Sequence, residues 1–179
     1  AMSKGLDCVI GTTGFSEADV ADVRELAEKS GTKVIIAPNF AIGAILMMKF
    51  ASMAARFFPD VEIIELHHNQ KMDAPSGTAI KTAELIIKER KDAISAPKNE
   101  MEKIKGARGG ELEGVRLHSV RLPGFVAHQE VIFGNAGQTL TIRHDSINRE
   151  SFMPGVIMSI RKLKDIDGVV YGLEGLLGL

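Results

Sequence analysis

The sequence predicts a fold of α/β plus α+β class, in which a strand–helix–strand (βαβ) unit is followed by a longer α+β part. The apolar runs Leu6–Ile10 and Lys33–Ala37 flank an amphipathic helical pattern, an order that favours two parallel strands joined by a helix. Later stretches that alternate polar and apolar residues predict an antiparallel meander. These stretches are 115–122, 126–133 and 138–144. We place the boundary between the two parts near Ala41.

Helix signals divide the rest of the chain. Ser16 and Asp19 have the spacing of a capping box and Gly31 provides a C-terminal stop, so a capped helix is expected between the first two strands. Ser76 is a second candidate cap. The further elements expected are a buried helix over 42–58, a strand over 61–66, a helix over 77–91, a long mobile loop over 92–114 and a closing helix over 151–163.

Composition excludes several classes of protein. With 179 residues, of which 45% are hydrophobic and 25% charged, the chain has the proportions of a globular protein with one domain or two small ones. The formal net charge of -1 argues against a nucleic-acid partner. Cys8 is the single cysteine, so no disulfide can form within the chain, and a reducing compartment is expected.

No membrane partner is predicted either. The most apolar stretch, Ile42–Phe58, contains Lys49 and Arg56 and is shorter than the ~20 residues of a membrane span. The start of the sequence does not show a basic segment followed by an apolar one, as a secretory leader would. We therefore expect a cytoplasmic protein.

The densest cluster of chemically useful groups lies in the string Glu65–Ala79, directly after the strand expected over 61–66. It places two imidazoles, an ammonium and a carboxylate ahead of a helix N-terminus, whose free N–H groups and partial positive charge suit a carboxylate or phosphate. An imidazole exchanges a proton near neutral pH, so His67 or His68 is a candidate acid–base group. Lys71 adds a full positive charge. The string predicts a site for an anionic substrate that must be protonated.

Other interpretations of this string remain open. Taken singly, Ser76 is a helix cap, Lys71 is a solvated charge and the histidines are hydrogen-bonded loop residues. A metal-dependent hydrolase that uses His67 and His68 is a sharper alternative, but neighbouring histidines cannot easily share one ion. The remaining histidines lie on expected strands without the spacing of metal ligands, and they are His118, His128 and His144. We therefore predict no metal.

A second candidate site lies where the two strands of the βαβ unit end. The loop Gly11–Gly14 follows the first strand, and Ala37–Phe40 follows the second strand on the same edge, where α/β proteins bind ligands. Asn39 offers a carboxamide suited to another amide, and Phe40 offers a stacking face. The full dinucleotide fingerprint G-x-G-x-x-G is absent from the sequence. The residues therefore predict half a nucleotide site, and the alternative is a glycine turn whose threonines satisfy the backbone.

The string Glu65–Ala79 resembles the signature of the 4-hydroxy-tetrahydrodipicolinate reductase family, pyridine-nucleotide enzymes of bacterial diaminopimelate and lysine biosynthesis. Three further blocks resemble the same family, namely Val9–Phe15, Ala37–Gly43 and Ser146–Phe152. The resemblance covers essentially the whole chain. It implies an oxidoreductase that reduces 4-hydroxy-tetrahydrodipicolinate to tetrahydrodipicolinate, with loss of water, by hydride transfer from NADH or NADPH.

The resemblance also implies roles for individual residues at the matching positions. His67 would be the catalytic proton donor, and Lys71 a second catalytic donor and charge partner. The residues that bind the carboxylates of the dicarboxylate substrate would be His68, Gly77 and Thr78. The cofactor-binding residues near the nicotinamide would be Gly11, Thr12, Thr13, Ala37, Pro38, Asn39 and Phe40.

Members of this family begin with a phosphate-binding loop and further βα units ahead of the glycine–threonine block, so the resemblance implies that this part is missing from the sequence. A partial Rossmann-type βαβ unit, the remnant of the dinucleotide-binding domain, is then expected over 1–40 and 150–179. The resemblance implies that it is joined to a substrate-binding and oligomerisation domain over 41–149, whose mixed open sheet forms a homotetramer.

Two questions stay open at this stage. The alternative to a reductase is a non-catalytic fragment that oligomerises or binds a dicarboxylate without competent cofactor binding. The preference for NADH or NADPH is not predicted, because the residues that contact the adenosine ribose belong to the part implied to be missing.

Overall fold

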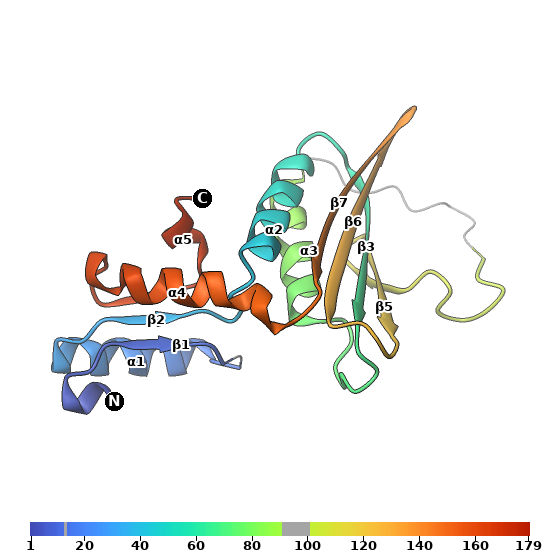
Figure 1. Cartoon of the computed structure of the whole chain (residues 1–179). Helices are drawn as coiled ribbons and strands as arrows, with labels where there is room; N and C mark the ends of the chain where they lie inside the picture. Colours follow the sequence, from blue (N-terminus) through green and yellow to red (C-terminus); the bar gives the residue numbers. More distant parts are fainter. Residues whose placement is uncertain (13, 91–100) are drawn as a thin grey trace. The chain divides into compact units, whose positions relative to one another are not determined.

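The described residues of the computed structural model are 1–12, 14–90 and 101–179. They form two units, and Figure 1 shows the course of the chain through both. Unit 1 comprises Ala1–Ile45 and Arg149–Leu179, whereas unit 2 is the continuous stretch Leu46–Asn148. The chain therefore leaves unit 1 once and returns to it once.

Unit 1 contains a parallel sheet of three short strands in the order β1-β2-β8. The strands are β1 (Cys8–Ile10), β2 (Val34–Ile36) and β8 (Val169–Tyr171). The central strand β2 is completely buried, as expected for the middle strand of a parallel sheet. The parallel pair of the βαβ unit is confirmed, and the C-terminal tail adds a third strand that was not predicted from the sequence.

The helix between β1 and β2 follows the predicted pattern. This helix, α1 (Glu17–Ser30), begins at a capping box in which the Asp19 N–H donates to the Ser16 hydroxyl (3.1 Å) and the Ser16 N–H donates to the Asp19 carboxylate (2.8 Å). It ends at Gly31, whose φ of 64° suits glycine. The core of the unit consists of Val23, Ala27, Val34, Ile36 and Val169. The other helices of unit 1 are η1 (Met2–Lys4), η2 (Arg149–Phe152), α4 (Met153–Lys162), η3 (Leu163–Asp165) and α5 (Glu174–Leu177).

Unit 2 contains a mixed sheet of five strands in the order β4-β5-β3-β6-β7. The strands are β3 (Asp60–His67), β4 (Gly110–Leu112), β5 (Val115–Arg121), β6 (Ala127–Asn135) and β7 (Gln138–Ser146). The central strand β3 pairs in parallel with β5 and antiparallel with β6, and β6 pairs antiparallel with β7. The predicted combination of a βαβ unit with a mixed open sheet is thus confirmed.

The predicted meander is wrong in one respect. It made β5 and β6 neighbours, but β3 lies between them, and only β6 and β7 form the expected hairpin. The connection 122–126 crosses the end of β3 and spans two inter-strand spacings, about 10 Å, which an extended segment of that length can reach. Alternating polarity identified each strand correctly, but it contains no information about which strands pair.

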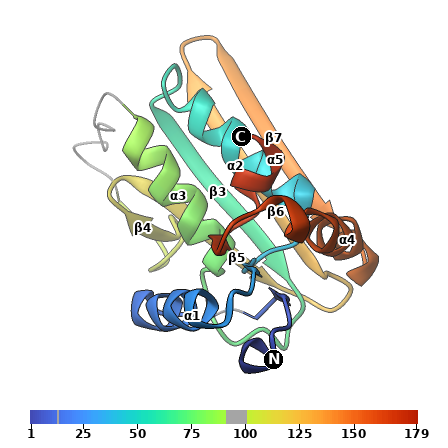
Figure 2. The ribbon, with the colours of Figure 1, turned by 90° about the vertical axis from the view of Figure 1, so that its left-hand side faces the viewer.

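Two helices of unit 2 lie on the same face of the sheet (Figures 1 and 2). They are α3 (Gly77–Glu89) and the part of α2 (Ile42–Ala54) that follows Ile45. The Ser76 hydroxyl caps α3 by accepting from the Ala79 N–H (3.2 Å), as predicted. The buried apolar residues of unit 2 include Met47, Met48, Ala51, Val61, Ile63, Ala83, Ile86, Val115, Leu117, Val131 and Phe133. In the described part of the chain, no helix covers the opposite face of the sheet.

Some predicted segment boundaries differ from the structure. The helix expected over 42–58 ends at Ala54, where the Phe57 N–H already donates to the Ala54 carbonyl in a turn, and the closing helix begins at Met153. Within the loop expected over 92–114, residues 110–112 form β4, because backbone hydrogen bonds hold a short edge strand without an apolar run. Residues 92–100 lie outside the described residues.

None of the helices in the described ranges combines the length and the hydropathy needed to cross a membrane.

Candidate active site

The candidate active site of unit 2 is organised by a carboxylate on the buried face of β3. Val61, Ile63 and Glu65 alternate along the strand and point toward the helices, so the period of two that buries the first two residues also buries Glu65. The Glu65 side chain is 0% exposed. A charge in such a position requires hydrogen-bond partners or an opposite charge, and Glu65 has both.

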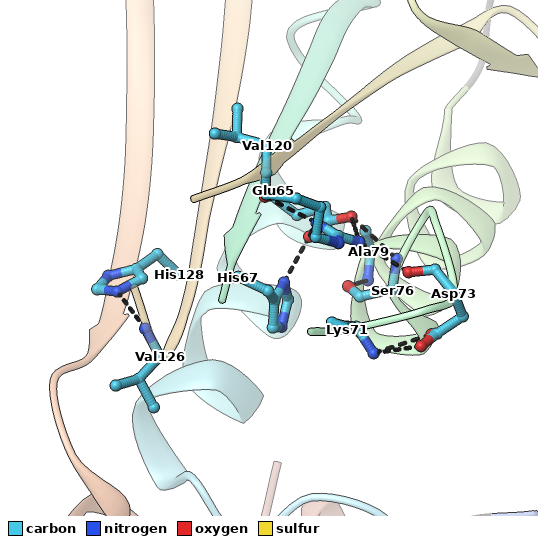
Figure 3. Close-up of polar contacts among 10 residues, drawn as sticks. Glu65, His67, Lys71, Asp73, Ser76, Ala79, Val120, Val126 and His128 are labelled. Carbon is cyan, nitrogen blue, oxygen red and sulfur yellow. Dashed lines mark hydrogen bonds and ion pairs between the residues drawn. The ribbon is translucent and has the colours of Figure 1, made fainter. Parts of the chain in front are cut away.

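Glu65 accepts hydrogen bonds from Arg121, from His67 and from the backbone of Ser76 (Figure 3). Arg121, at the end of β5, binds it in a bidentate manner, with Nη2 2.7 Å from Oε1 and Nη1 2.9 Å from Oε2. The Ser76 N–H donates to Oε1 (3.2 Å). His67 Nδ1 lies 2.5 Å from Oε2. The carboxylate therefore joins the end of β3, the end of β5 and the start of α3.

The protonation of this cluster follows from these contacts. Burial raises the pKa of Glu65, but hydrogen bonds from His67, Arg121 and Ser119 outweigh burial and lower the pKa to about 2. Glu65 is therefore ionised at neutral pH and can only accept hydrogen bonds. The hydrogen in the contact with His67 must then reside on Nδ1, so Nε2 is the ring atom left to exchange a proton with another molecule. The Glu65 hydrogen bonds in turn raise the pKa of Arg121.

A cation lies in the loop that joins β3 to α3. Lys71 Nζ contacts both carboxylate oxygens of Asp73, at 2.8 and 2.9 Å. The Lys71 hydrogen bond is the main cause of a lowered pKa at Asp73. Arg121 Nη2 also donates to the Asp73 carbonyl (2.8 Å), which ties this loop to the Glu65 cluster. Lys71 thus pairs with a carboxylate of its own loop. The Asp73 side chain is 64% exposed, so another anion can compete with it for Lys71.

The N-terminus of α3 offers hydrogen-bond donors next to this cation. The Ser76 N–H is bound to Glu65 and the Ala79 N–H to the Ser76 hydroxyl. The N–H groups of Gly77 and Thr78 have no intrahelical acceptor at this position, and no partner for them is present in the described ranges. No acidic residue lies in the first turn. This end of the helix therefore suits a bound carboxylate.

The structure brings some of the predicted site residues together. His67, Lys71, Gly77 and Thr78 all belong to β3, the following loop or the start of α3, and the Glu65–Arg121 contacts connect these segments. His68 is exposed, and it contributes to the loop through its backbone, where its carbonyl accepts from the Lys71 N–H (3.1 Å).

The predicted cofactor-binding residues belong to unit 1. Gly11 and Thr12 follow β1, and Ala37–Phe40 follow β2, so both segments lie at the carboxyl edge of parallel strands. The Phe40 ring packs so closely on Gly11 that a Cβ built there would lie 2.6 Å from it. The Asn39 side-chain oxygen accepts from the Ala41 N–H (2.9 Å), which fixes the orientation of the carboxamide. Thr13 lies outside the described residues.

The N-terminus of α1 does not resemble a phosphate site. Its first turn contains Glu17 and Asp19, and the Asp19 carboxylate occupies the Ser16 N–H. The pKa of Asp19 is lowered by its hydrogen bonds with Ser16, so this helix end already holds a negative charge. A pyrophosphate would be repelled here.

The other histidines lie on the sheet of unit 2. His118 contacts Glu62 (2.8 Å) and His128 contacts Asp145 (2.7 Å). Burial lowers the pKa of His144. Within the described ranges, no group of three or more His, Cys, Asp or Glu side chains is arranged to hold a metal ion.

Sequence reasoning missed Arg121 and the role of Glu65. In both strands every second residue points toward the helices. The other residues at these inward positions include Val61 and Ile63 on β3 and Leu117 on β5, and all three are apolar. A charged residue at an inward position is an anomaly that can be detected in a sequence. Two anomalies of opposite sign on different strands would have predicted a buried ion pair.

Comparisons with known proteins identify the family of the chain. The family described as "Dihydrodipicolinate reductase, C-terminus" matches residues 43–177, and the one described as "Dihydrodipicolinate reductase, N-terminus" matches residues 1–40. The chain belongs to the dihydrodipicolinate reductase family. The resemblance stated from the sequence is thereby confirmed.

Individual dihydrodipicolinate reductases are similar over nearly the whole chain. The 4-hydroxy-tetrahydrodipicolinate reductases of Halalkalibacterium halodurans and Bacillus subtilis are each 60% identical over 177 residues, which is 99% of this chain and 67% and 66% of theirs. A dipicolinate-bound dihydrodipicolinate reductase from Paenisporosarcina sp. TG-14 superposes with a TM-score of 0.85 at 54% identity, over 97% of this chain and 66% of that one. The chain thus spans about two thirds of the length of these relatives.

Proposed function

We propose that this chain supplies the substrate-binding and proton-donating residues of an NADH- or NADPH-dependent 4-hydroxy-tetrahydrodipicolinate reductase of diaminopimelate and lysine biosynthesis. The family membership and the names of the similar proteins support this function. The observation that carries it is the contact between ionised Glu65 and His67 Nδ1, beside Lys71 and the open N-terminus of α3.

The donors of this site suit a small dicarboxylate. One carboxylate would accept from the N–H groups of Gly77 and Thr78, where the helix end favours a negative charge. The other would bind Lys71 in place of Asp73, with His68 at the same loop. The similar reductase from Paenisporosarcina binds dipicolinate, which is itself a dicarboxylate. Two separate anion positions explain why the site would select a dicarboxylate over a monocarboxylate.

The residues of the site perform the proton half of the reduction. The reaction adds one hydride and one proton to the substrate ring, and one water leaves. His67 would give the proton from Nε2 once the imidazole has taken up a proton there, and it would return to the neutral form with its remaining hydrogen on Nδ1, which Glu65 holds. Lys71 would hold the substrate and serve as a second donor. The nicotinamide cofactor supplies the hydride when it is bound.

The residues of unit 1 fit the nicotinamide end of such a cofactor. Gly11 leaves the backbone open beside the Phe40 ring, and the fixed Asn39 carboxamide is suited to another amide. We assign cofactor contact to Gly11, Thr12, Thr13 and the segment Ala37–Phe40. Residues 1–40 and 150–179 would then form part of the dinucleotide-binding domain, and 41–149 the substrate-binding and oligomerisation domain.

We further propose that the protein is a cytoplasmic homotetramer. The face of the unit 2 sheet opposite α2 and α3 carries half-buried apolar residues among its charges, which suits contact with another copy. Those residues are Ile64, Leu66, Val120 and Ile132. Sedimentation velocity of the chain gives the test, and a monomer at all concentrations would contradict this assembly.

A second candidate function is favoured by the N-terminus of α1. Since Glu17 and Asp19 already place negative charge there, unit 1 has no phosphate site at this helix, and the chain by itself could bind a dicarboxylate without holding a cofactor. Its affinity for NADH discriminates the two functions. A dissociation constant in the millimolar range or weaker would favour the binding module.

The first experiment measures dipicolinate binding to this chain by calorimetry. Lys71→Ala should weaken the affinity about tenfold or more, because a hydrogen bond to a charged group is lost. Lys29→Ala is the matched control, since Lys29 also pairs with a carboxylate, Glu25, but belongs to unit 1. Equal affinities of Lys71→Ala and the parent chain would refute the assignment.

The second experiment measures oxidation of NADH and NADPH with substrate generated in the cuvette. Turnover that His67→Ala abolishes while dipicolinate binding persists would support a reductase with His67 as proton donor. Dipicolinate binding without turnover by the parent chain would support the binding module instead.

A further inference from the structure

Arg121 occupies a position that the proposed reaction does not yet explain. It is the last residue of β5, its side chain is 18% exposed, and it binds residues of two other segments, β3 and the Lys71 loop. Nη1 and Nη2 bind the two oxygens of Glu65, Nη1 also donates to the Val120 carbonyl, and Nη2 donates to the Asp73 carbonyl. A side chain 56 residues away from Glu65 in sequence therefore joins the proton-donor strand to the Lys71 loop.

The same carboxylate connects Arg121 to the third segment. Glu65 Oε1 accepts from both Arg121 Nη2 and the Ser76 N–H, the first backbone donor ahead of α3. The segments that carry His67, Lys71 and Gly77 are thus connected through one ion pair. Their spacing has to match the two carboxylates of a dicarboxylate, and the planar guanidinium fixes this spacing better than a flexible ammonium would.

The charge of Arg121 also decides what Glu65 does to His67. A fully buried carboxylate without a counter-ion would take up a proton rather than stay charged. A protonated Glu65 can donate to His67 Nδ1 instead of accepting from it. The neutral imidazole would then carry its hydrogen on Nε2, and the nitrogen without a hydrogen would be Nδ1, which is bound to Glu65.

We propose that Arg121 and Glu65 are a positioning pair of this site. They hold His67 as the Nδ1–H tautomer, which reserves Nε2 for proton transfer, and they hold the Lys71 loop against the start of α3. Neither residue transfers a proton to the substrate. The inference rests on the proposed function for its substrate, but the tautomer of His67 is a property of the free chain.

The test records the ¹⁵N spectrum of the imidazoles in the ligand-free chain, with His67 assigned by comparison with His67→Ala. In the parent chain we expect the Nδ1–H tautomer. Arg121→Met, which keeps the apolar stem and removes the charge, should shift His67 toward the Nε2–H tautomer. Arg56→Met is the matched control, because it breaks an exposed pair with Glu89 in the same unit, and it should leave the His67 signals unchanged.

A conservative variant separates positioning from general damage. Arg121→Lys keeps a positive charge beside Glu65 but loses the bidentate contact, so the tautomer should persist while dipicolinate affinity falls about tenfold. If Arg121→Met does not fold, Glu65→Gln preserves the size of the side chain and should produce the same change of tautomer. Unchanged His67 signals in whichever of these two variants folds would overturn the inference. Failure of the parent chain to bind dipicolinate would refute the proposed function and leave the tautomer result to decide this inference separately.

Discussion

Glu65 makes the stability of unit 2 depend on pH in the acid range. Burial raises the pKa of this carboxyl, yet hydrogen bonds from His67, Arg121 and Ser119 bring it from 4.5 to about 2. A group whose pKa is depressed by folding contributes stability that is complete above its unfolded pKa and is lost as the pH falls through the folded value. Glu65 therefore contributes about 3 kcal/mol to the free energy of unfolding at pH 7, and about 2 kcal/mol of this is lost by pH 3.

The variant Glu65→Gln isolates this contribution, because it cannot titrate. Urea unfolding followed by circular dichroism should show the largest difference between parent and variant at pH 7, and this gap should narrow by about 2 kcal/mol by pH 3. Glu89→Gln, which removes one partner of the exposed Arg56 pair, should cost no more than about 1 kcal/mol at pH 7. A gap for Glu65→Gln that stays constant from pH 7 to pH 3 would refute the ionised state assigned to Glu65.

Two further predictions concern the anion site and unit 1. Asp73→Asn removes the carboxylate that competes with the ligand for Lys71, so the affinity for dipicolinate measured by calorimetry should rise about two- to fivefold. A lower affinity would show that Asp73 contributes to dipicolinate binding. Gly155→Ala places a Cβ 2.1 Å from the Phe40 carbonyl oxygen and should lower the free energy of unfolding of unit 1 by about 1–3 kcal/mol in urea. Gly175→Ala is the control, because its Cβ meets open space and should not destabilise the unit. Equal urea midpoints for the two variants would contradict the close packing of Gly155 on Phe40.

Local patterns in the sequence were sufficient for the individual elements. The capping box at Ser16 and the cap at Ser76 correctly place the starts of two helices, because a cap depends on residues three positions apart. The cluster around His67 and Lys71 was visible for the same reason, since its members share one strand and one loop. The family resemblance then assigned to these residues roles that their chemistry permits.

Contacts between distant segments were not predictable in this way. Alternation along 115–122 identifies β5, but the insertion of β3 between β5 and β6 depends on pairing energies across the whole sheet. Arg121 reaches Glu65 only because β5 runs parallel to β3, so its role follows from the strand order and not from its neighbours in sequence. The pairing of β8 with β2 likewise joins residues that are far apart in the chain.

The position of β8 determines the order in which the two units can fold as the protein is made. Unit 2 is continuous in sequence, so all of its strands have been synthesised once residue 148 has been added, and it can fold while translation continues. The parallel sheet of unit 1 includes Val169–Tyr171. Strand β2 therefore pairs only with β1 until β8 has been synthesised. A ribosome that stalls between these points would carry the complete sheet of unit 2 and an unfinished parallel sheet in unit 1, whose open edge can mispair with other nascent chains.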